Sequence, residues 1–153
     1  MGKEIERKFL VLNDQYRKSA IRSVHITQAY ISTDPNATVR VRIMDSKAFI
    51  TIKGITSNAT RDEWEYEIPC HDAKEIMDRC AKTPIIDKTR YYYNGWEIDE
   101  FHGHLEGLTV AEIELYTPES QFDKPSFIGR EVTDDKRYYN SVLSISKECP
   151  PTR

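Results

Sequence analysis

The feature that most constrains the fold is a two-residue alternation of apolar and charged side chains that recurs along most of the chain. Successive side chains of a β-strand point to opposite faces, so this alternation predicts strands with one apolar and one charged face. Turn-forming segments separate the strands, among them Asp34-Pro35-Asn36, Met44-Asp45-Ser46-Lys47 and Asn94-Gly95. We expect eight strands, over residues 3–11, 25–33, 37–44, 48–54, 62–69, 85–93, 96–102 and 108–116.

Helical spacing interrupts this series twice before the tail. Asp72 can cap a helix that ends at Thr83-Pro84, and Asn13 or Asp14 can cap a weaker one. The tail from Pro118 onward predicts short helical pieces that dock back through Val142, Leu143 and Ile145. We find no internal repeat and no linker, so residues 1–153 are expected to form one α+β domain.

Composition excludes several classes of function. The 22 basic and 25 acidic residues give a net charge of -3, which disfavours nucleic-acid binding by a basic surface. No apolar run approaches the roughly 20 residues of a membrane span, and the charged start lacks a signal core. The 3 cysteines form no CxxC pair, which disfavours a disulfide framework or a structural zinc site. A cytoplasmic protein without nucleic-acid or membrane partners is expected.

The charged faces of the strands separate by sign. A single alternating strand is more often a solvated face than a site, but like charges at neighbouring positions of one face repel each other. Eight strands can close into a barrel, and a lumen filled with charge is too costly to be kept for stability alone. Convergent bases suit a polyanion, and paired acids suit divalent cations. The acidic rows are Glu4 and Glu6, Glu63 to Glu67, Glu97 and Asp99, and Glu112 and Glu114; the basic positions are Lys8, Arg40, Arg42, Lys53, Lys88 and Arg90.

The ordered motifs resemble those of a known family. The opening Glu4-Ile5-Glu6-Arg7-Lys8 matches the ExExK signature of the CYTH superfamily, the triphosphate tunnel metalloenzymes. The resemblance covers nearly the whole chain and is strongest to the short stand-alone bacterial inorganic triphosphatases. The other matching motifs, in order, are Arg40-Val41-Arg42, Thr51-Ile52-Lys53, Lys88-Thr89-Arg90-Tyr91, Glu97-Ile98-Asp99, Glu112-Ile113-Glu114 and the tail from Glu131 to Tyr138.

This resemblance implies an eight-stranded antiparallel closed barrel with a few flanking helices. It also implies hydrolysis of inorganic triphosphate inside the tunnel, with Mg²⁺ or Mn²⁺, by in-line attack of a water that the metal activates. Metal ligands would be Glu4, Glu6, Asp99, Glu112 and Glu114. Phosphate would be bound by Lys8, Arg40, Arg42, Lys53, Lys88, Arg90 and, from the tail, Lys136. Catalytic roles fall to Lys8 with its partner Tyr30, and to Glu63 and Glu65, which would help with a second metal or the water.

Alternatives remain open at this level. Nucleoside triphosphates could be additional substrates, and the same fold could serve an adenylate cyclase of the class IV type or a thiamine triphosphatase. A different class is a module that binds polyphosphate without cutting it, although such a module would need only the bases. Homodimer formation also stays open.

Overall fold

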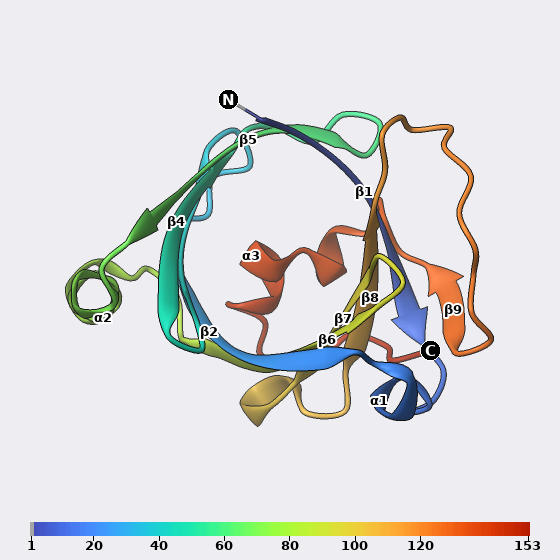
Figure 1. The fold of residues 1–153 in the computed structure, drawn as a ribbon. Helices are drawn as coiled ribbons and strands as arrows, with labels where there is room; N and C mark the ends of the chain where they lie inside the picture. Colours follow the sequence, from blue (N-terminus) through green and yellow to red (C-terminus); the bar gives the residue numbers. More distant parts are fainter. Residues whose placement is uncertain (1) are drawn as a thin grey trace.

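The computed structural model describes residues 2–153 and shows a ring of strands around a central lumen (Figure 1). The sheet has nine strands in the order β5-β4-β3-β2-β6-β7-β8-β1-β9, and a further pairing of β5 with β1 closes the first eight into a barrel. All pairings are antiparallel. The strands are β1 (Gly2–Val11), β2 (Arg22–Ser32), β3 (Thr38–Met44), β4 (Lys47–Lys53), β5 (Thr60–Ile68), β6 (Ile86–Tyr93), β7 (Trp96–Phe101), β8 (Thr109–Glu114) and β9 (Ile128–Glu131).

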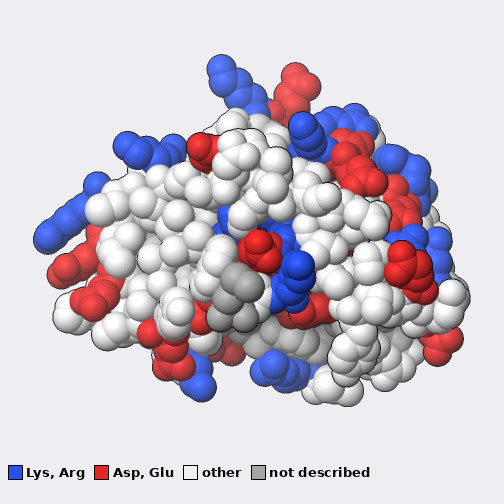
Figure 2. Space-filling model, turned by 90° about the horizontal axis from the view of Figure 1, so that it is seen from above, with Lys and Arg blue, Asp and Glu red and all other residues white. Residues whose placement is uncertain are grey.

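Most apolar side chains of the strands point outward, so much of the hydrophobic core lies around the barrel. Helix α2 (Cys70–Cys80) covers one side, where Ala73 and Met77 pack on Ala29, Val41 and Ala48. A second cluster gathers near the short helix α1 (Tyr16–Ser19). The third contains strand residues with the same parity as the inward charges of β1, β6, β7 and β8, so it fills the barrel interior beneath the tail. Figure 2 shows one outer wall that is mostly uncharged at its centre, with a small group of acidic and basic side chains there and others around the edges.

Three short helical pieces complete the described chain: η1 (Gly103–Leu105), η2 (Lys136–Tyr138) and α3 (Asn140–Leu143). Helices α1 and α2 stand outside the ring, whereas α3 lies within its outline in Figure 1. None of the helices in residues 2–153 is both long and apolar enough to cross a membrane.

The closed barrel and the eight predicted strands are confirmed, and so are the hairpin turns. Asp45 has a φ of 52°, and Asn94 and Gly95 have φ values of 44° and 83°, as tight hairpins require. The sequence missed β9, which has four residues and therefore little room for alternation.

The helix ends differ from the predictions. Helix α2 begins at Cys70 with Pro69 as its extended N-cap residue, so Asp72 lies inside the first turn and caps nothing. It ends at Cys80, before Thr83-Pro84. Before α1, Asn13 accepts a hydrogen bond from the backbone N–H of Gln15, in a turn that precedes the helix. In the tail Leu143 is buried, whereas Ile145 is 57% exposed and does not dock.

Strand β1 closes the barrel at its start and pairs with the C-terminal part of the chain at its end. Its first residues pair with β5, and its last pair with β9, with a register shift between Phe9 and Val11. Between these pairings the backbone N–H of Val132 donates to the carbonyl of Lys8 at 2.8 Å, and the Lys8 N–H donates to Thr133 Oγ1 at 3.0 Å. These bonds lead the tail from β9 toward the lumen, where it covers one end.

Candidate active site

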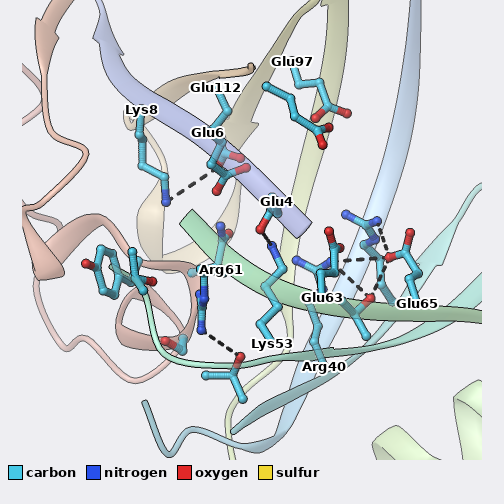
Figure 3. Close-up of a pocket in the computed structure, with 18 of the residues that line it drawn as sticks. Glu4, Glu6, Lys8, Arg40, Lys53, Arg61, Glu63, Glu65, Glu97 and Glu112 are labelled. Atoms are coloured by element: carbon cyan, nitrogen blue, oxygen red, sulfur yellow. Dashed lines mark hydrogen bonds and ion pairs between the residues drawn. The ribbon is translucent and has the colours of Figure 1, made fainter. Parts of the chain in front are cut away.

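A cavity of about 240 Å³ occupies the lumen (Figure 3). Because side chains alternate along each strand, the inward positions of β1, β3, β4, β5, β6, β7 and β8 supply its charges. Acidic and basic rows therefore share one enclosed space. The charged lining consists of the bases Lys8, Arg40, Arg42, Lys53, Arg61 and Arg90 and the acids Glu4, Glu6, Glu63, Glu65, Glu97, Glu112 and Glu114.

Most of these charges are paired between adjacent strands or between strands two apart in the barrel. Lys53 Nζ donates to Glu4 Oε2 at 2.6 Å, and Lys8 Nζ lies 3.6 Å from Glu112 Oε1. Glu65 Oε1 accepts from Arg42 at 3.2 Å and from Thr51 Oγ1 at 2.6 Å. These ion pairs lie at the surface of the cavity, where a bound ligand could replace one partner of each pair.

Two arginines keep unused donors. Arg40 and Arg42 are both buried, and neither Nε–H finds a hydrogen-bond partner within the described part of the chain. A buried donor without a partner costs about 1–3 kcal/mol. Burial together with Arg40 and Arg90 lowers the pKa of Arg42 to about 10, so both guanidiniums stay charged near neutral pH. An anion between these side chains would relieve the repulsion and could take up the free donors.

Glu6 is the most crowded carboxylate of the lumen. Burial, followed by the neighbouring Glu112 and Glu4, raises the pKa of Glu6 well above its usual value. Burial also opposes ionisation of Glu112, but Lys8 and a hydrogen bond with Glu6 contribute to lowering the pKa of Glu112 to about 2. Glu6 therefore ionises less readily than an ordinary glutamate, and a cation beside it would favour the ionised form.

A separate cluster of charges is fully sealed. Asp99 is 2% exposed and accepts from Lys88 Nζ at 2.6 Å and from Arg90 at 2.7 and 2.9 Å. Lys88 is 0% exposed and also donates to Asn140 Oδ1 at 3.2 Å. Burial raises the pKa of Asp99, but Arg90 and Lys88 outweigh it and the net shift is strongly downward. Asp99 and Lys88 were predicted as a metal ligand and a phosphate ligand, yet neither lines the cavity.

The other predicted residues divide between the cavity and the surface. Tyr30 is buried and lines the cavity, as do Glu63, Glu65 and Glu114. The predicted contact between Tyr30 and Lys8 differs from the structure, in which Lys8 Nζ donates a hydrogen bond to the backbone carbonyl of Tyr138 at 3.0 Å. Lys136 is exposed on η2 and does not line the cavity.

The sequence missed part of the lining. Arg61 has the same parity on β5 as Glu63 and Glu65, so alternation alone could have placed it inside. Among the uncharged lining residues, Thr38 and Thr51 have the inward parity of β3 and β4, whereas the others come largely from turns and from the tail, where alternation gives no signal. These uncharged lining residues include Thr38, Thr51, Thr56, Ala59, Thr133, Tyr139, Asn140 and Ser141.

The donor set of the lumen fits a divalent cation in charge and ligand type. Six basic and seven acidic side chains line the cavity, so a highly charged anion gains little net attraction unless cations neutralise carboxylates. Burial and the neighbouring acids Glu112 and Glu4 raise the pKa of Glu6, and a bound cation would favour its ionised form. Within residues 2–153 no three carboxylate, imidazole or thiol groups converge closely enough to hold an ion as they stand. Binding would therefore have to open the pairs of Glu4 with Lys53 and of Glu112 with Lys8.

Comparison with known proteins agrees with this geometry. The model of the CYTH domain matches residues 2–144. The chain belongs to the CYTH family. An inorganic triphosphatase of Acetivibrio thermocellus is 48% identical to it over 147 residues, which are 94% of each chain. An inorganic triphosphatase of Nitrosomonas europaea is 32% identical over 151 residues, covering 94% of this chain and 97% of that protein. The crystal structure of an inorganic triphosphatase superposes with a TM-score of 0.66 at 30% identity, covering 95% and 99% of the two chains.

Proposed function

We propose that this CYTH protein hydrolyses inorganic triphosphate within its barrel, and that residues 1–153 act as a single domain. The observation that carries the proposal is the enclosed lumen in which paired arginines and lysines face paired glutamates. The likeness to two inorganic triphosphatases over nearly the full chain supports the same reaction.

The cationic side chains would bind and orient the phosphate chain. Arg40 and Arg42 stand two residues apart on β3, and each guanidinium can grip phosphate oxygens through two parallel bonds. Lys8 and Lys53 supply compact charges from β1 and β4. Phosphoryl transfer needs positioning and charge neutralisation more than covalent chemistry, and this set of residues is built for both.

We assign the metal ligands to Glu4, Glu6, Glu112 and Glu114, and we remove Asp99 from this set because its oxygens are already bonded to Lys88 and Arg90. Carboxylates with room between them suit Mg²⁺ or Mn²⁺. Once bound, such an ion neutralises phosphate oxygens and lowers the pKa of a bound water. Glu63 and Glu65 are assigned to binding a second ion or to holding the attacking water. Tyr30 is assigned to orienting the basic side chains of β3, beginning with Arg40, its pairing partner.

Phosphate binding by Lys88 and Lys136 has less support. Lys88 is sealed behind Asp99 and Asn140, so we assign it to holding Asp99 and the tail. Lys136 would have to move from the surface to reach a phosphate group. Arg90 keeps its proposed contact with phosphate because it lines the cavity while Asp99 fixes its guanidinium.

A substrate panel tests the proposal. Phosphate release is measured from tripolyphosphate, ATP and thiamine triphosphate, each with Mg²⁺ and with Mn²⁺, and EDTA is the control. We expect release from tripolyphosphate to be fastest and EDTA to abolish it. Cyclic AMP formed from ATP would favour the cyclase alternative, and tight binding of tripolyphosphate without release would favour a binding module. A preference for thiamine triphosphate would move the assignment to that substrate.

A further inference from the structure

Arg61 differs from every other cation that lines the cavity. Each of the others has a carboxylate oxygen within 4 Å: Lys8 has Glu112, Arg40 and Arg42 share Glu65, Lys53 has Glu4, and Arg90 has Asp99 and Glu97. Within residues 2–153, no carboxylate lies that close to a side-chain nitrogen of Arg61. Its charge is therefore uncompensated by any direct ion pair.

Neutral groups hold the Arg61 guanidinium in place. Its Nε–H donates to the carbonyl of Gly54 at 2.9 Å, and Nη2 donates to Thr38 Oγ1 at 3.3 Å. A guanidinium has five N–H donors, so these two contacts leave three free. Figure 3 shows the side chain reaching into the cavity between Lys53 and the tail, with the bond to Thr38 drawn. The side chain is thus fixed and half-buried, and still has donors to offer.

The register of the strands places Arg61 near one end of the lumen. Thr38 at the start of β3 pairs with Lys53 at the end of β4, and Lys53 pairs with Glu63 near the start of β5. Uncharged groups close this end, among them Thr56 and Ala59 from the β4–β5 connection and residues 139–141 from the tail. A linear anion in the lumen would end here, with Arg61 next to its last group.

We propose that Arg61 binds one terminal phosphoryl group of the polyphosphate and so fixes where the bound chain ends. This assignment rests on the proposed function and names a substrate contact for the same lumen. A terminal phosphoryl group carries more charge than an internal one, because it has an additional ionisable oxygen. Arg61 can meet this charge without breaking an ion pair, whereas Lys53 must first leave Glu4. Arg61 therefore contributes its full attraction to binding.

The test compares Arg61→Met and Arg61→Lys with wild type and with Arg79→Met, a control on the exposed surface of α2. Affinity for linear tripolyphosphate and for cyclic trimetaphosphate, which has no terminal phosphoryl group, is measured by calorimetry on metal-free protein in EDTA, and kcat and KM for tripolyphosphate are measured with Mg²⁺. For Arg61→Met we expect at least tenfold weaker binding of tripolyphosphate, less than threefold weaker binding of trimetaphosphate, and a KM raised tenfold with kcat within threefold. Arg61→Lys keeps the charge and is expected to lie between, and Arg79→Met to match wild type.

Unchanged affinity for tripolyphosphate in Arg61→Met would overturn the assignment, and so would an equal loss for both anions. Should Arg61→Met fail to fold by circular dichroism, a loss of affinity in Arg61→Lys for the linear anion but not for the cyclic one decides. If wild type releases no phosphate but Arg61→Met still weakens tripolyphosphate selectively, the proposed function fails and the terminal contact stands. If wild type hydrolyses tripolyphosphate and neither Arg61 variant differs from it, only the contact fails.

Discussion

The barrel contains two groups of charges that differ in how completely their members are paired. In the sealed group, Asp99 accepts bonds of 2.6 to 2.9 Å from Lys88 and Arg90; Lys88 and Asp99 lie behind the cavity wall, and Arg90 also reaches the cavity. In the open group, Glu4, Glu6, Glu112 and Lys53 line the cavity, and Glu6 is crowded by two acids. Because the charges of the first group are fully hydrogen-bonded to one another, this group is a fixed part of the structure. The charges of the second group are incompletely paired, so they can exchange their ion pairs for contacts with a ligand.

This contrast separates structural charge from functional charge within one tunnel. A buried cluster whose members are all bonded holds the wall together, and removing one member leaves the others unpaired at a cost of several kcal/mol. Groups that repel each other in the free protein instead favour binding of a ligand with the charge they lack. The number of bonded partners of each charge distinguishes the two groups.

The largest expected effect breaks the sealed group. Asp99→Asn leaves Lys88 and Arg90 without their shared carboxylate, so we expect the free energy of unfolding to fall by about 3–5 kcal/mol. Urea denaturation of metal-free protein measures it. Glu97→Gln is the matched control, because Glu97 bonds to Arg90 at the cavity surface and its loss should cost much less. Equal stability of Asp99→Asn and wild type would mean that the cluster holds nothing together.

The next effect breaks the open group. We expect Glu6→Gln to lower phosphate release from tripolyphosphate at least 100-fold, which corresponds to about 2.7 kcal/mol, while stability in EDTA stays equal or rises. The neutral amide binds a cation less well than a carboxylate, so the metal loses a ligand. The free protein loses an acid whose ionisation burial and Glu112 oppose. Glu75→Gln on the exposed face of α2 serves as control. Wild-type rates in Glu6→Gln would take this residue out of the site. Glu4 is less suitable, because its loss would leave Lys53 unpaired.

A smaller effect concerns the arginines between the two groups. Arg40→Ala should raise KM for tripolyphosphate about tenfold, or about 1.4 kcal/mol, with kcat within threefold, because Arg40 grips phosphate in the ground and transition states alike. Steady-state kinetics beside Lys74→Ala, an exposed change on α2, measure it. A large drop in kcat at constant KM would instead place Arg40 at the transition state alone.

The smallest signal is the acid dependence of stability. The lowered pKa of Asp99 means that its stabilisation is present above the carboxyl pKa of the unfolded chain and is lost as pH falls below it. Below about pH 4, the free energy of unfolding should therefore fall less steeply with pH in Asp99→Asn than in wild type. The difference in slope is up to that of one proton, about 1.4 kcal/mol per pH unit. Urea midpoints between pH 2.5 and 6 measure the slope. Parallel curves for the two proteins would show that Asp99 keeps an ordinary pKa.

Alternation predicted the barrel because every strand must sort its side chains between lumen and core. Strand β9 was not predicted because it forms by pairing with the edge of β1, and its four residues are too few to show an alternating pattern in the sequence. The start of α2 was placed at the side chain of Asp72, whereas the chain uses the extended backbone of Pro69.

The sequence predicts which side chains of a strand face the lumen, because parity along the strand determines this. It does not predict which of them are already bonded to another side chain. Parity put Glu4, Glu6 and Arg40 on inward faces, and it could also have found Arg61. Parity could not show that Asp99 is already bonded, although the two-residue turn at Asn94-Gly95 sets the register that pairs Arg90 with Asp99. The tail residues that line the cavity depend on contacts between segments more than 100 positions apart, such as Lys8 with Tyr138.

The pairing of β1 has a consequence for biosynthesis. This strand leaves the ribosome before its partners β5, β8 and β9, and β8 ends only at Glu114. The ring therefore cannot close until Glu114 has been synthesised, and until then β1 has an unpaired edge. Such long-range pairing folds slowly and exposes a strand to aggregation. The interval between synthesis of β1 and synthesis of β8 is therefore the period in which this chain is most prone to aggregate.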